Sequence, residues 1–392
     1  MVSPRVATAG IFAANGAAIA TWVAQIPSVQ ERLAISKSVI GLSLLCMAAG
    51  ALVAMPLTGQ LLARRPSAGV TRIAIAVQCV LVPLPLLAPS PVLLGAFLMV
   101  FGAANGVCDV GMNAHGVAVE KAIGRPILSG LHGGWSVGGL AGAGGAALGA
   151  ALGADPRVEA AVAGLVVLAF AAVVGRHLGA YSTAEAGPAP KLRVPPRGVV
   201  LLGALCFAIM VTEGAMGDWS GIYLRDETGA ARGVASLGFA GFSLGMAAGR
   251  FTGDALVARL GATPILRAGA ALVVVALGGL LAAQQSELGV AGFTLVGLGV
   301  ANAVPLLFSF AGRVRGTASA PALAAVFTMG YTGFIVGPPV IGVLADAIGL
   351  PYALALLCLA AGSVAVLGGR ATRASEPLGS AAAGAADPVP AR

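Results

Sequence analysis

Long apolar runs separated by short polar stretches fill this chain. Twelve of the runs contain about 20 residues or more, enough for a helix to cross about 30 Å of hydrocarbon. None alternates as a half-buried strand would, so their length favours helices. The pattern predicts an all-α integral membrane protein with twelve transmembrane helices. The predicted helices cover residues 6–27, 37–63, 70–88, 91–117, 126–152, 157–177, 198–224, 234–259, 264–283, 288–311, 320–346 and 350–369.

Composition supports a membrane protein. Of the 392 residues, 58% are hydrophobic and 10% are charged, whereas a soluble domain carries about 25% charged residues. The net charge of +8 does not indicate nucleic acid binding, because the basic residues stand singly between apolar runs. The five cysteines lie inside apolar runs without a CxxC pair, so we expect neither disulfides nor a metal site. No cofactor is expected.

The basic residues orient the predicted helices. With the N-terminus in the cytoplasm, seventeen of the 23 Lys and Arg residues lie on the cytoplasmic side, five lie outside and Arg250 lies within a helix. Cytoplasmic loops carry the excess of Lys and Arg, so both termini are predicted to be cytoplasmic. We therefore expect a multi-pass protein of a bacterial inner membrane.

The chain divides into two similar halves. Residues 1–178 and 198–370 each contain six of the predicted helices, and a Pro-rich basic stretch at 179–197 is predicted to be a cytoplasmic linker. Residues 371–392 are small and polar, which predicts a disordered cytoplasmic tail.

Short sequences recur between the halves in one register. Met47–Gly50 recurs as Met246–Gly249, and Gly102–Asn105 recurs in part as Gly299–Asn302. Two repeated halves are typical of transporters that alternate access around a site near the midplane between the repeats.

Four stretches carry a family resemblance: Asp109–Glu120, Gly124–Gly142, Glu213–Leu224 and Gly249–Gly261. Through them the chain resembles the major facilitator superfamily over nearly its whole length. More narrowly it resembles the YbjJ-like branch, which is related to the fucose permeases. The resemblance implies alternating access, often with proton-coupled symport of a small polar solute, and no enzymatic activity.

Asn105, Asp109 and Asn113 recur every four residues in the fourth predicted helix, so they share one face. A charge near the bilayer centre costs roughly 2.5–3.5 kcal/mol on insertion scales, and a buried carboxyl favours its protonated form. Asp109 is therefore predicted to couple transport to protons, and the alternative is a structural acid satisfied by its neighbours. In fucose permeases an acid followed four residues later by Asn takes part in coupling, and Asp109 and Asn113 match that pattern.

Glu213 lies near the middle of the seventh predicted helix and is the second candidate for proton coupling. Asp218 and Trp219 are candidates for substrate binding. Because Glu213 and Asp218 are five residues apart, they point about 140° away from each other on a regular helix. A local break at the glycines of this helix would be needed to bring them together.

The remaining candidates lie on three other helices. Asn15, Trp22 and Gln25 share a face of the first helix and are predicted, with Asn105, Asn113 and Asn302, to contact the substrate. For the tryptophans the alternative is anchoring at the membrane interface. Arg250 and Asp254 are spaced to form an ion pair on the eighth helix, and the resemblance implies a role in gating.

These observations favour a secondary active transporter that imports a small polar or sugar-like solute with protons, using the proton gradient as its energy source. The expected partners are the solute, protons and the lipid bilayer, and the protein is expected to be a monomer. Two alternatives remain: a proton-coupled exporter of drugs or metabolites, and a non-transporting membrane sensor or enzyme. The sequence shows no catalytic cluster or sizeable soluble domain that the last alternative would need.

Overall fold

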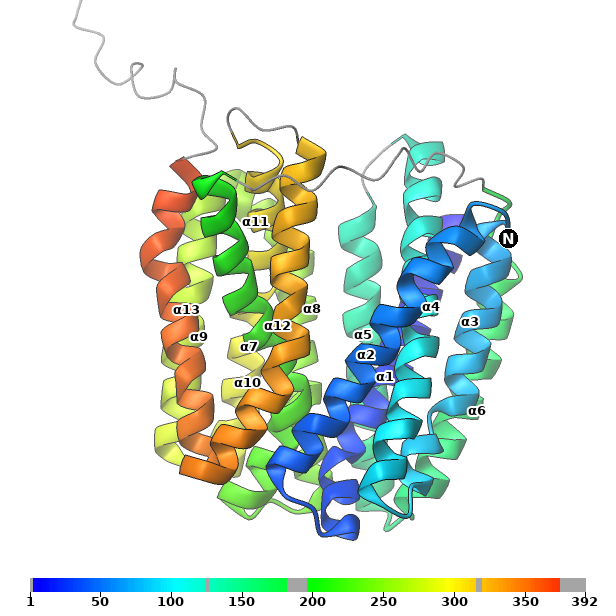
Figure 1. The fold of residues 1–392 in the computed structure, drawn as a ribbon, viewed down its shortest axis with the longest axis vertical. Helices are drawn as coiled ribbons and strands as arrows, with labels where there is room; N and C mark the ends of the chain where they lie inside the picture. Colours follow the sequence, from blue (N-terminus) through cyan, green and yellow to red (C-terminus); the bar gives the residue numbers. More distant parts are fainter. Residues whose placement is uncertain (1–2, 125–126, 182–195, 315–318, 374–392) are drawn as a thin grey trace, which may run out of the picture.

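The regular elements of this protein are helices throughout the residues that its computed structural model describes, which are 3–124, 127–181, 196–314 and 319–373. Figure 1 shows them as one bundle of long, roughly parallel helices. The elements are α1 (Pro4–Leu33), α2 (Lys37–Leu62), α3 (Ser67–Leu81), η1 (Leu84–Leu87), α4 (Pro91–Ile123), α5 (Leu128–Ala151), α6 (Pro156–Gly175), α7 (Arg197–Thr228), α8 (Arg232–Leu260), α9 (Ala262–Ala283), α10 (Ser286–Val300), α11 (Ala303–Ala311), α12 (Ser319–Ile348) and α13 (Leu350–Arg373). The predicted all-α class is confirmed.

Eleven segments of the described chain are helical, long and apolar enough to cross a membrane. The helix α5 is not among them, although it lies in the bundle against α1 and α8. The described structure therefore shows a multi-pass membrane protein, and the number twelve stays a prediction.

Two predicted helices are interrupted at prolines. The third ends at Leu81, and the short 3₁₀ turn η1 follows beside Pro83 and Pro85, which cannot donate backbone hydrogen bonds. The predicted segment 288–311 matches one candidate span, Ser286–Ala311, but it is divided, because α10 ends at Val300 and α11 begins at Ala303. Pro305 has no N–H for the carbonyl four residues earlier, which favours a break at this point.

The helices form two sides. In Figure 1, α1 to α6 lie on one side of a vertical seam and α7 to α13 lie on the other. The start of α1 and the end of α13 lie at the same end of the bundle, which we call the termini end, and we call the opposite end the distal end. Most of the predicted linker and tail lies outside the described residues, so the domain boundaries stay predictions.

Glycines let neighbouring helices pack backbone against backbone. A methyl group at Gly102 of α4 would overlap the carbonyl of Met47 on α2, and one at Gly297 of α10 would overlap the carbonyl of Phe242 on α8. Such small residues allow close packing in lipid, where apolar burial does not drive helices together. The two helix pairs occupy related places in the two sides, as the sequence repeat predicts.

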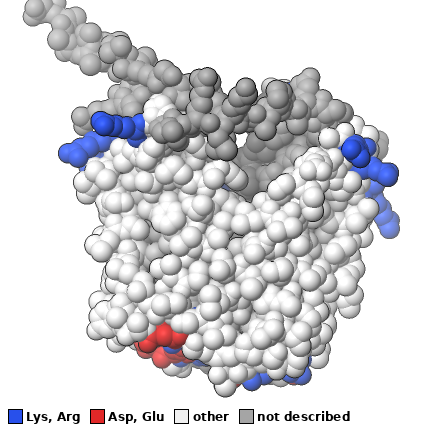
Figure 2. Space-filling model, viewed as in Figure 1, with Lys and Arg blue, Asp and Glu red and all other residues white. Residues whose placement is uncertain are grey.

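The two sides meet mainly where α5 packs on α8 and α2 packs on α12. Gly41 of α2 lies against the backbone of Pro338 and Pro339 on α12, near the distal end. Figure 2 shows a hollow between the sides at the termini end, and it shows an uncharged belt between the two charged ends of this face. The bundle is therefore closed at the distal end and notched at the termini end.

Candidate functional site

A network of neutral polar groups lies inside the first side. The amide of Asn15 on α1 donates to Gln78 Oε1 on α3 at 2.8 Å and to Asn105 Oδ1 on α4 at 3.0 Å. Gln78 also donates to Asn105 Oδ1 at 3.1 Å. Trp135 Nε1 on α5 donates to Asn15 Oδ1 at 2.8 Å. We call Asn15, Gln78, Asn105 and Trp135 the carboxamide network, and it ties four helices together.

Asp109 lies one turn beyond this network on α4. Its carboxylate accepts a hydrogen bond from Asn113 Nδ2 at 3.0 Å, and the same amide group donates to the Asp109 carbonyl at 2.9 Å. Tyr331 of α12, on the other side of the seam, is close enough to interact electrostatically with Asp109. The carboxylate thus has one described hydrogen-bond partner, an amide of its own helix.

Glu213 and Arg250 form an ion pair in the second side. The Arg250 Nη2 atom lies 3.6 Å from Glu213 Oε1, and both side chains are more than four-fifths buried. Arg250 Nη1 also donates to the His132 carbonyl at 3.2 Å and to Ser136 Oγ at 3.1 Å, both on α5 of the first side. One guanidinium therefore joins the midpoint of α7 to the opposite side of the seam.

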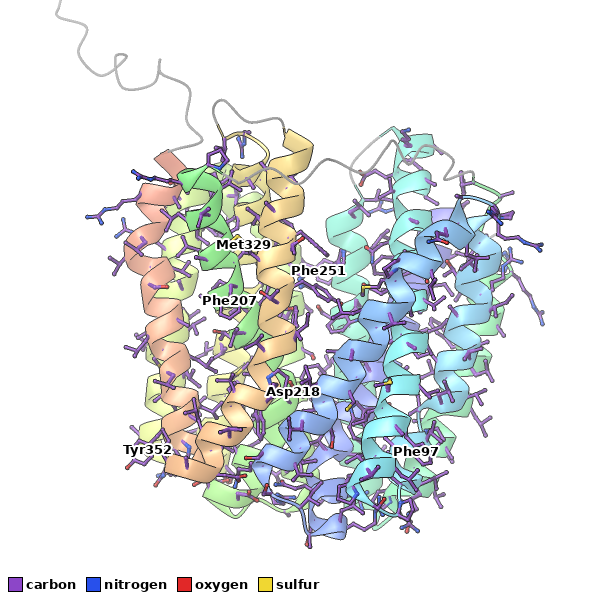
Figure 3. All side chains as sticks on the ribbon, in the orientation of Figure 1. Phe97, Phe207, Asp218, Phe251, Met329 and Tyr352 are labelled. Carbon is purple, nitrogen blue, oxygen red and sulfur yellow. The ribbon has the colours of Figure 1, made fainter. Side chains whose placement is uncertain are left out.

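Asp218 has no hydrogen-bond or ion-pair partner among the described residues, and it is only partly exposed. Figure 3 shows it along the seam between the two sides. The helix α7 is unbroken from Arg197 to Thr228, so the glycines do not bring Asp218 and Glu213 to one point.

Apolar side chains lie nearer the termini end of the second side, where Figure 3 shows Phe207, Phe251 and Met329, and Phe251 reaches Gly133 of α5 across the seam. Beside them a row of aromatic rings runs along α12. Phe327 stacks with Tyr331 at a centroid distance of 5.5 Å, and Phe308 of α11 and Phe334 of α12 extend the row. Such ring faces can stack on a planar or ring-shaped solute.

The two tryptophans singled out from the sequence are buried. Trp22 is 1% exposed and Trp219 is 0% exposed, and neither indole N–H has a hydrogen-bond partner among the described residues. The Trp219 ring packs beside Gly342 of α12. Because interfacial anchors sit at the lipid headgroups, this burial does not support the anchoring interpretation.

Gln25 lies away from Asn15, next to the distal end. It donates to the carboxylate of Glu159 on α6, which also pairs with Arg232 on α8 at 2.5 Å. Arg232 further donates to the Ala154 carbonyl at 2.9 Å. Glu159 thereby links α1 to the second side.

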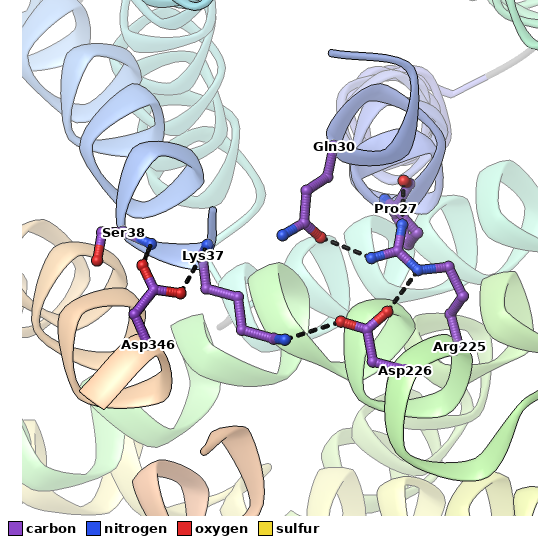
Figure 4. A network of polar contacts seen from close by, with 7 residues as sticks. All are labelled: Pro27, Gln30, Lys37, Ser38, Arg225, Asp226 and Asp346. Carbon is purple, nitrogen blue, oxygen red and sulfur yellow. Dashed lines mark hydrogen bonds and ion pairs between the residues drawn. The ribbon is translucent and has the colours of Figure 1, made fainter. Parts of the chain in front are cut away.

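More charged contacts cross the seam at the distal end (Figure 4). Lys37 on α2 pairs with Asp226 on α7 at 2.9 Å. The carboxylate of Asp346 on α12 accepts from the backbone N–H groups of Lys37 and Ser38, at 3.1 and 2.8 Å, where the positive end of the α2 dipole attracts it.

Arg225 on α7 completes this arrangement. It donates to Gln30 Oε1 at 2.7 Å and to the Pro27 carbonyl, both on α1. We call the set of Lys37, Glu159, Arg225, Asp226, Arg232 and Asp346 the distal latch. Its members come from α2, α6, α7, α8 and α12, and together with their partners on α1 they close this end of the molecule.

Asn302 lies at the break between α10 and α11, where its Nδ2 donates to the Gly249 carbonyl of α8 at 3.0 Å. It therefore joins two helices of the second side. The side chain of Asp254 lies outside the described residues, so its predicted pair with Arg250 stays a prediction. Arg250 instead has Glu213 as its described acidic partner.

The sequence analysis missed several members of these groups. Gln78 could have been found as a lone amide in an apolar segment. Glu159, Asp226 and Asp346 were not singled out, and the basic residues beside them were used only for topology. In the described part of the chain, no group of three or more His, Cys, Asp or Glu side chains is placed to hold a metal ion.

Relatives cover nearly the whole chain. It is 37% identical to an uncharacterised MFS-type transporter of Yersinia pestis over 369 residues, which is 93% of each protein. It is 33% identical to an uncharacterised transporter of Sinorhizobium fredii, over 94% of this chain and 98% of the relative. It is also 34% identical to membrane protein MosC of Rhizobium meliloti, over 90% and 86%.

Solved structures agree on the fold. A mutant of the nucleoside transporter NupG superposes with a TM-score of 0.74 at 11% identity, over 95% of this chain and all of that one. A bacterial homologue of the human lysosomal transporter Spinster, inward-facing and occupied, also gives 0.74, at 12% identity and over 94% and 96%. The family model of the Major Facilitator Superfamily matches residues 201–391. The chain therefore belongs to the Major Facilitator Superfamily of membrane transporters.

Proposed function

We propose that this protein is a proton-coupled secondary transporter that carries a small polar or sugar-like solute by symport. Residues 1–178 and 198–370 would rock against each other around a site at the seam. The observation that carries the proposal is the set of three carboxyl groups, Asp109, Glu213 and Asp218, held within membrane-spanning helices. Ionisable groups are expensive at that depth and generally mark ion or substrate paths.

Asp109 is the proposed main proton acceptor. Its one amide partner on its own helix stabilises the carboxylate without supplying a positive charge. Taking up a proton removes the charge, and this lowers the free energy needed to desolvate the carboxyl group in a closed, dry intermediate. Protonation would therefore favour reorientation of the loaded carrier.

Glu213 is the proposed second coupling group, with a different action. While ionised, it neutralises Arg250, which also binds two groups on α5. A proton on Glu213 would leave the guanidinium without its counter-ion and weaken the preferred position of Arg250. Coupling through Glu213 thus acts on the contact between α5 and α8, and this supports a gating role for Arg250.

Asn113 and Asp218 are the proposed first contacts of the solute, because both are partly exposed. Asn105 and Asn302 are also partly exposed, although their amide groups already bond to other helices. Asn15, Trp22, Gln25 and Trp219 are buried here. They would reach the solute only after the helices rearrange.

The proposed orientation places the termini end in the cytoplasm of a bacterial cell and the distal end outside. The excess of basic residues near the termini end supports it. In this orientation the distal latch closes the outer side, and its contacts must break before a solute can enter from outside.

The test uses purified protein in liposomes with an imposed proton gradient. A thermal-shift screen of sugars, acids and amines at two pH values first identifies a solute. Uptake of that solute should be accompanied by proton movement. Asp109→Asn should abolish accumulation of the solute, but solute exchange measured in the absence of a gradient should persist. If Asp109→Asn accumulates solute with wild-type pH dependence, the coupling role of Asp109 is wrong.

An exporter is the second candidate, and the aromatic row at Phe308, Phe327, Tyr331 and Phe334 favours it. Rings of this kind suit larger apolar compounds. The same liposomes distinguish the two functions, because a symporter moves solute in the direction of the imposed proton flow and an antiporter moves it in the opposite direction.

A further inference from the structure

An apolar groove runs along the outer face of the first side. It has a volume of about 450 Å³. It is lined by Leu61 of α2, by Arg65 and Pro66 of the following turn, by Gly69, Val70, Ile73, Ala74 and Val77 of α3, and by Ala104 and Val107 of α4. Apart from Arg65, every lining side chain is uncharged and apolar, so the groove suits a hydrocarbon chain.

The groove opens outward from the bundle. Ile73 is 69% exposed and Val77 is 44% exposed, whereas Ala74 and Ala104 are buried beneath them. In a membrane-spanning chain, exposed apolar side chains of this kind face lipid. Gly69 has no atom of another residue near the place where a side chain would begin, so the groove is open there.

The length of the groove matches one leaflet of a bilayer. The stretch from Pro66 to Val77 spans about 16 Å at about 1.5 Å per residue. One leaflet supplies about half of a hydrocarbon thickness of about 30 Å. A single acyl chain aligned with α3 could therefore lie along the groove, with its headgroup at the termini end.

The mouth of the groove is positive. Arg65 lies there and, like its neighbour Arg64, has no hydrogen-bond or ion-pair partner for its guanidinium among the described residues. The stretch from Gly59 to Arg65 contains no acidic residue. The helix α3 begins at Ser67 with no side-chain cap, so the positive end of its dipole faces the same region.

Arg72 is not part of this charge, because its guanidinium donates to the Leu178 carbonyl at 3.4 Å. We propose that the groove is a binding site for an anionic phospholipid, with one acyl chain along α3 and the phosphate at Arg65. A basic mouth on an intramembrane groove is the combination that selects anionic headgroups.

The test is native mass spectrometry of the delipidated full-length protein with added phosphatidylglycerol or phosphatidylcholine carrying identical acyl chains. The wild type should retain phosphatidylglycerol preferentially. Arg65→Gln should lower that preference by about fivefold, the effect of one basic residue near an anionic surface. Arg259→Gln, at the exposed end of α8, is the matched control and should change nothing.

A second variant tests the groove itself. A Cβ atom at Gly69 would meet no other residue, so Gly69→Leu should fold normally, project its side chain into the groove and reduce binding of both lipids. Melting temperatures without lipid check the fold of each variant, and inorganic phosphate is the headgroup control. The proposal is overturned if the two lipids bind the wild type equally or if Arg65→Gln behaves like Arg259→Gln. It is also overturned if Gly69→Leu keeps full lipid binding, or if inorganic phosphate raises the melting temperature as much as phosphatidylglycerol does.

Discussion

The two sides of the molecule place their interior polar groups differently. On the first side, the carboxamide network joins α1, α3, α4 and α5, and its members bond only within that side. On the second side, the ionised pair of Glu213 and Arg250 extends across the seam to α5.

The carboxamide network therefore has a structural role, whereas the pair of Glu213 and Arg250 has a conformational role. A neutral network closed within one side can hold four helices as a unit during movement. A charged contact across the seam changes whenever the sides move or a proton is gained. We therefore expect variants of the carboxamide network to affect mainly stability, and variants of Glu213 or Arg250 to affect transport as well as stability.

The largest effect should come from leaving Glu213 without its partner. Arg250→Met should destabilise the protein by about 3–5 kcal/mol, the usual cost of breaking a buried ion pair from one side. The loss should shrink at low pH, where a protonated Glu213 needs no counter-ion. Thermal unfolding in detergent measures both effects, and Arg259→Met on the same helix serves as the exposed control.

The double variant Arg250→Met with Glu213→Leu sharpens this test. It removes both charges, so most of the stability should return while accumulation of solute stays lost. A single variant that melts like the Arg259→Met control would show that the pair contributes neither to stability nor to the seam.

The next effect should come from the carboxamide network. Asn15→Leu leaves the part-buried N–H of Trp135 and the buried side-chain carbonyl of Gln78 without this partner, at up to about 1–3 kcal/mol for each group. Thr21→Val is the control, because Thr21 bonds only to its own helix at Ala17. Equal melting temperatures for the two variants would contradict the role assigned to the network.

A smaller effect on stability is expected at the distal latch. Lys37 and Asp226 are partly exposed, and such pairs contribute about 0.2–1 kcal/mol. Lys37→Met should nevertheless open the distal end more often, so that Ser28→Cys, beside Arg225, reacts faster with a membrane-impermeant maleimide. Arg157→Met, at an exposed position of the same end, should leave the labelling rate unchanged.

The smallest effect compares two tryptophans. Trp135→Phe removes a hydrogen bond to Asn15 and should cost about 1 kcal/mol. Trp219→Phe removes an N–H that has no described partner, so apart from a small change in packing it should cost less. Melting curves of the two variants decide the order, and a reversed order would contradict the proposed asymmetry between the sides.

Much of the fold could be predicted from the sequence because lipid demands long apolar helices with satisfied backbones. That demand placed most helix boundaries within a few residues. The break at Ala301–Asn302 was missed, because proline is often tolerated within transmembrane helices.

The candidate site was predicted less completely. Periodicity placed Asn105, Asp109 and Asn113 on one face of α4, and Asp109 does bond to Asn113. No spacing could show that Asn15 meets Gln78, 63 residues away, or that Arg250 meets Glu213 and α5. Such pairings depend on which faces of distant helices meet.

The sequence by itself determined that this chain is a multi-pass helical membrane protein of repeated design with acids placed within its helices, because hydropathy, repeat register and residue identity are local properties. Only the tertiary structure decided which acids have counter-ions, which indoles are buried and which end is latched. Those outcomes follow from helix packing, which sets distances between side chains that are far apart along the chain, and electrostatic and hydrogen-bond energies depend on those distances.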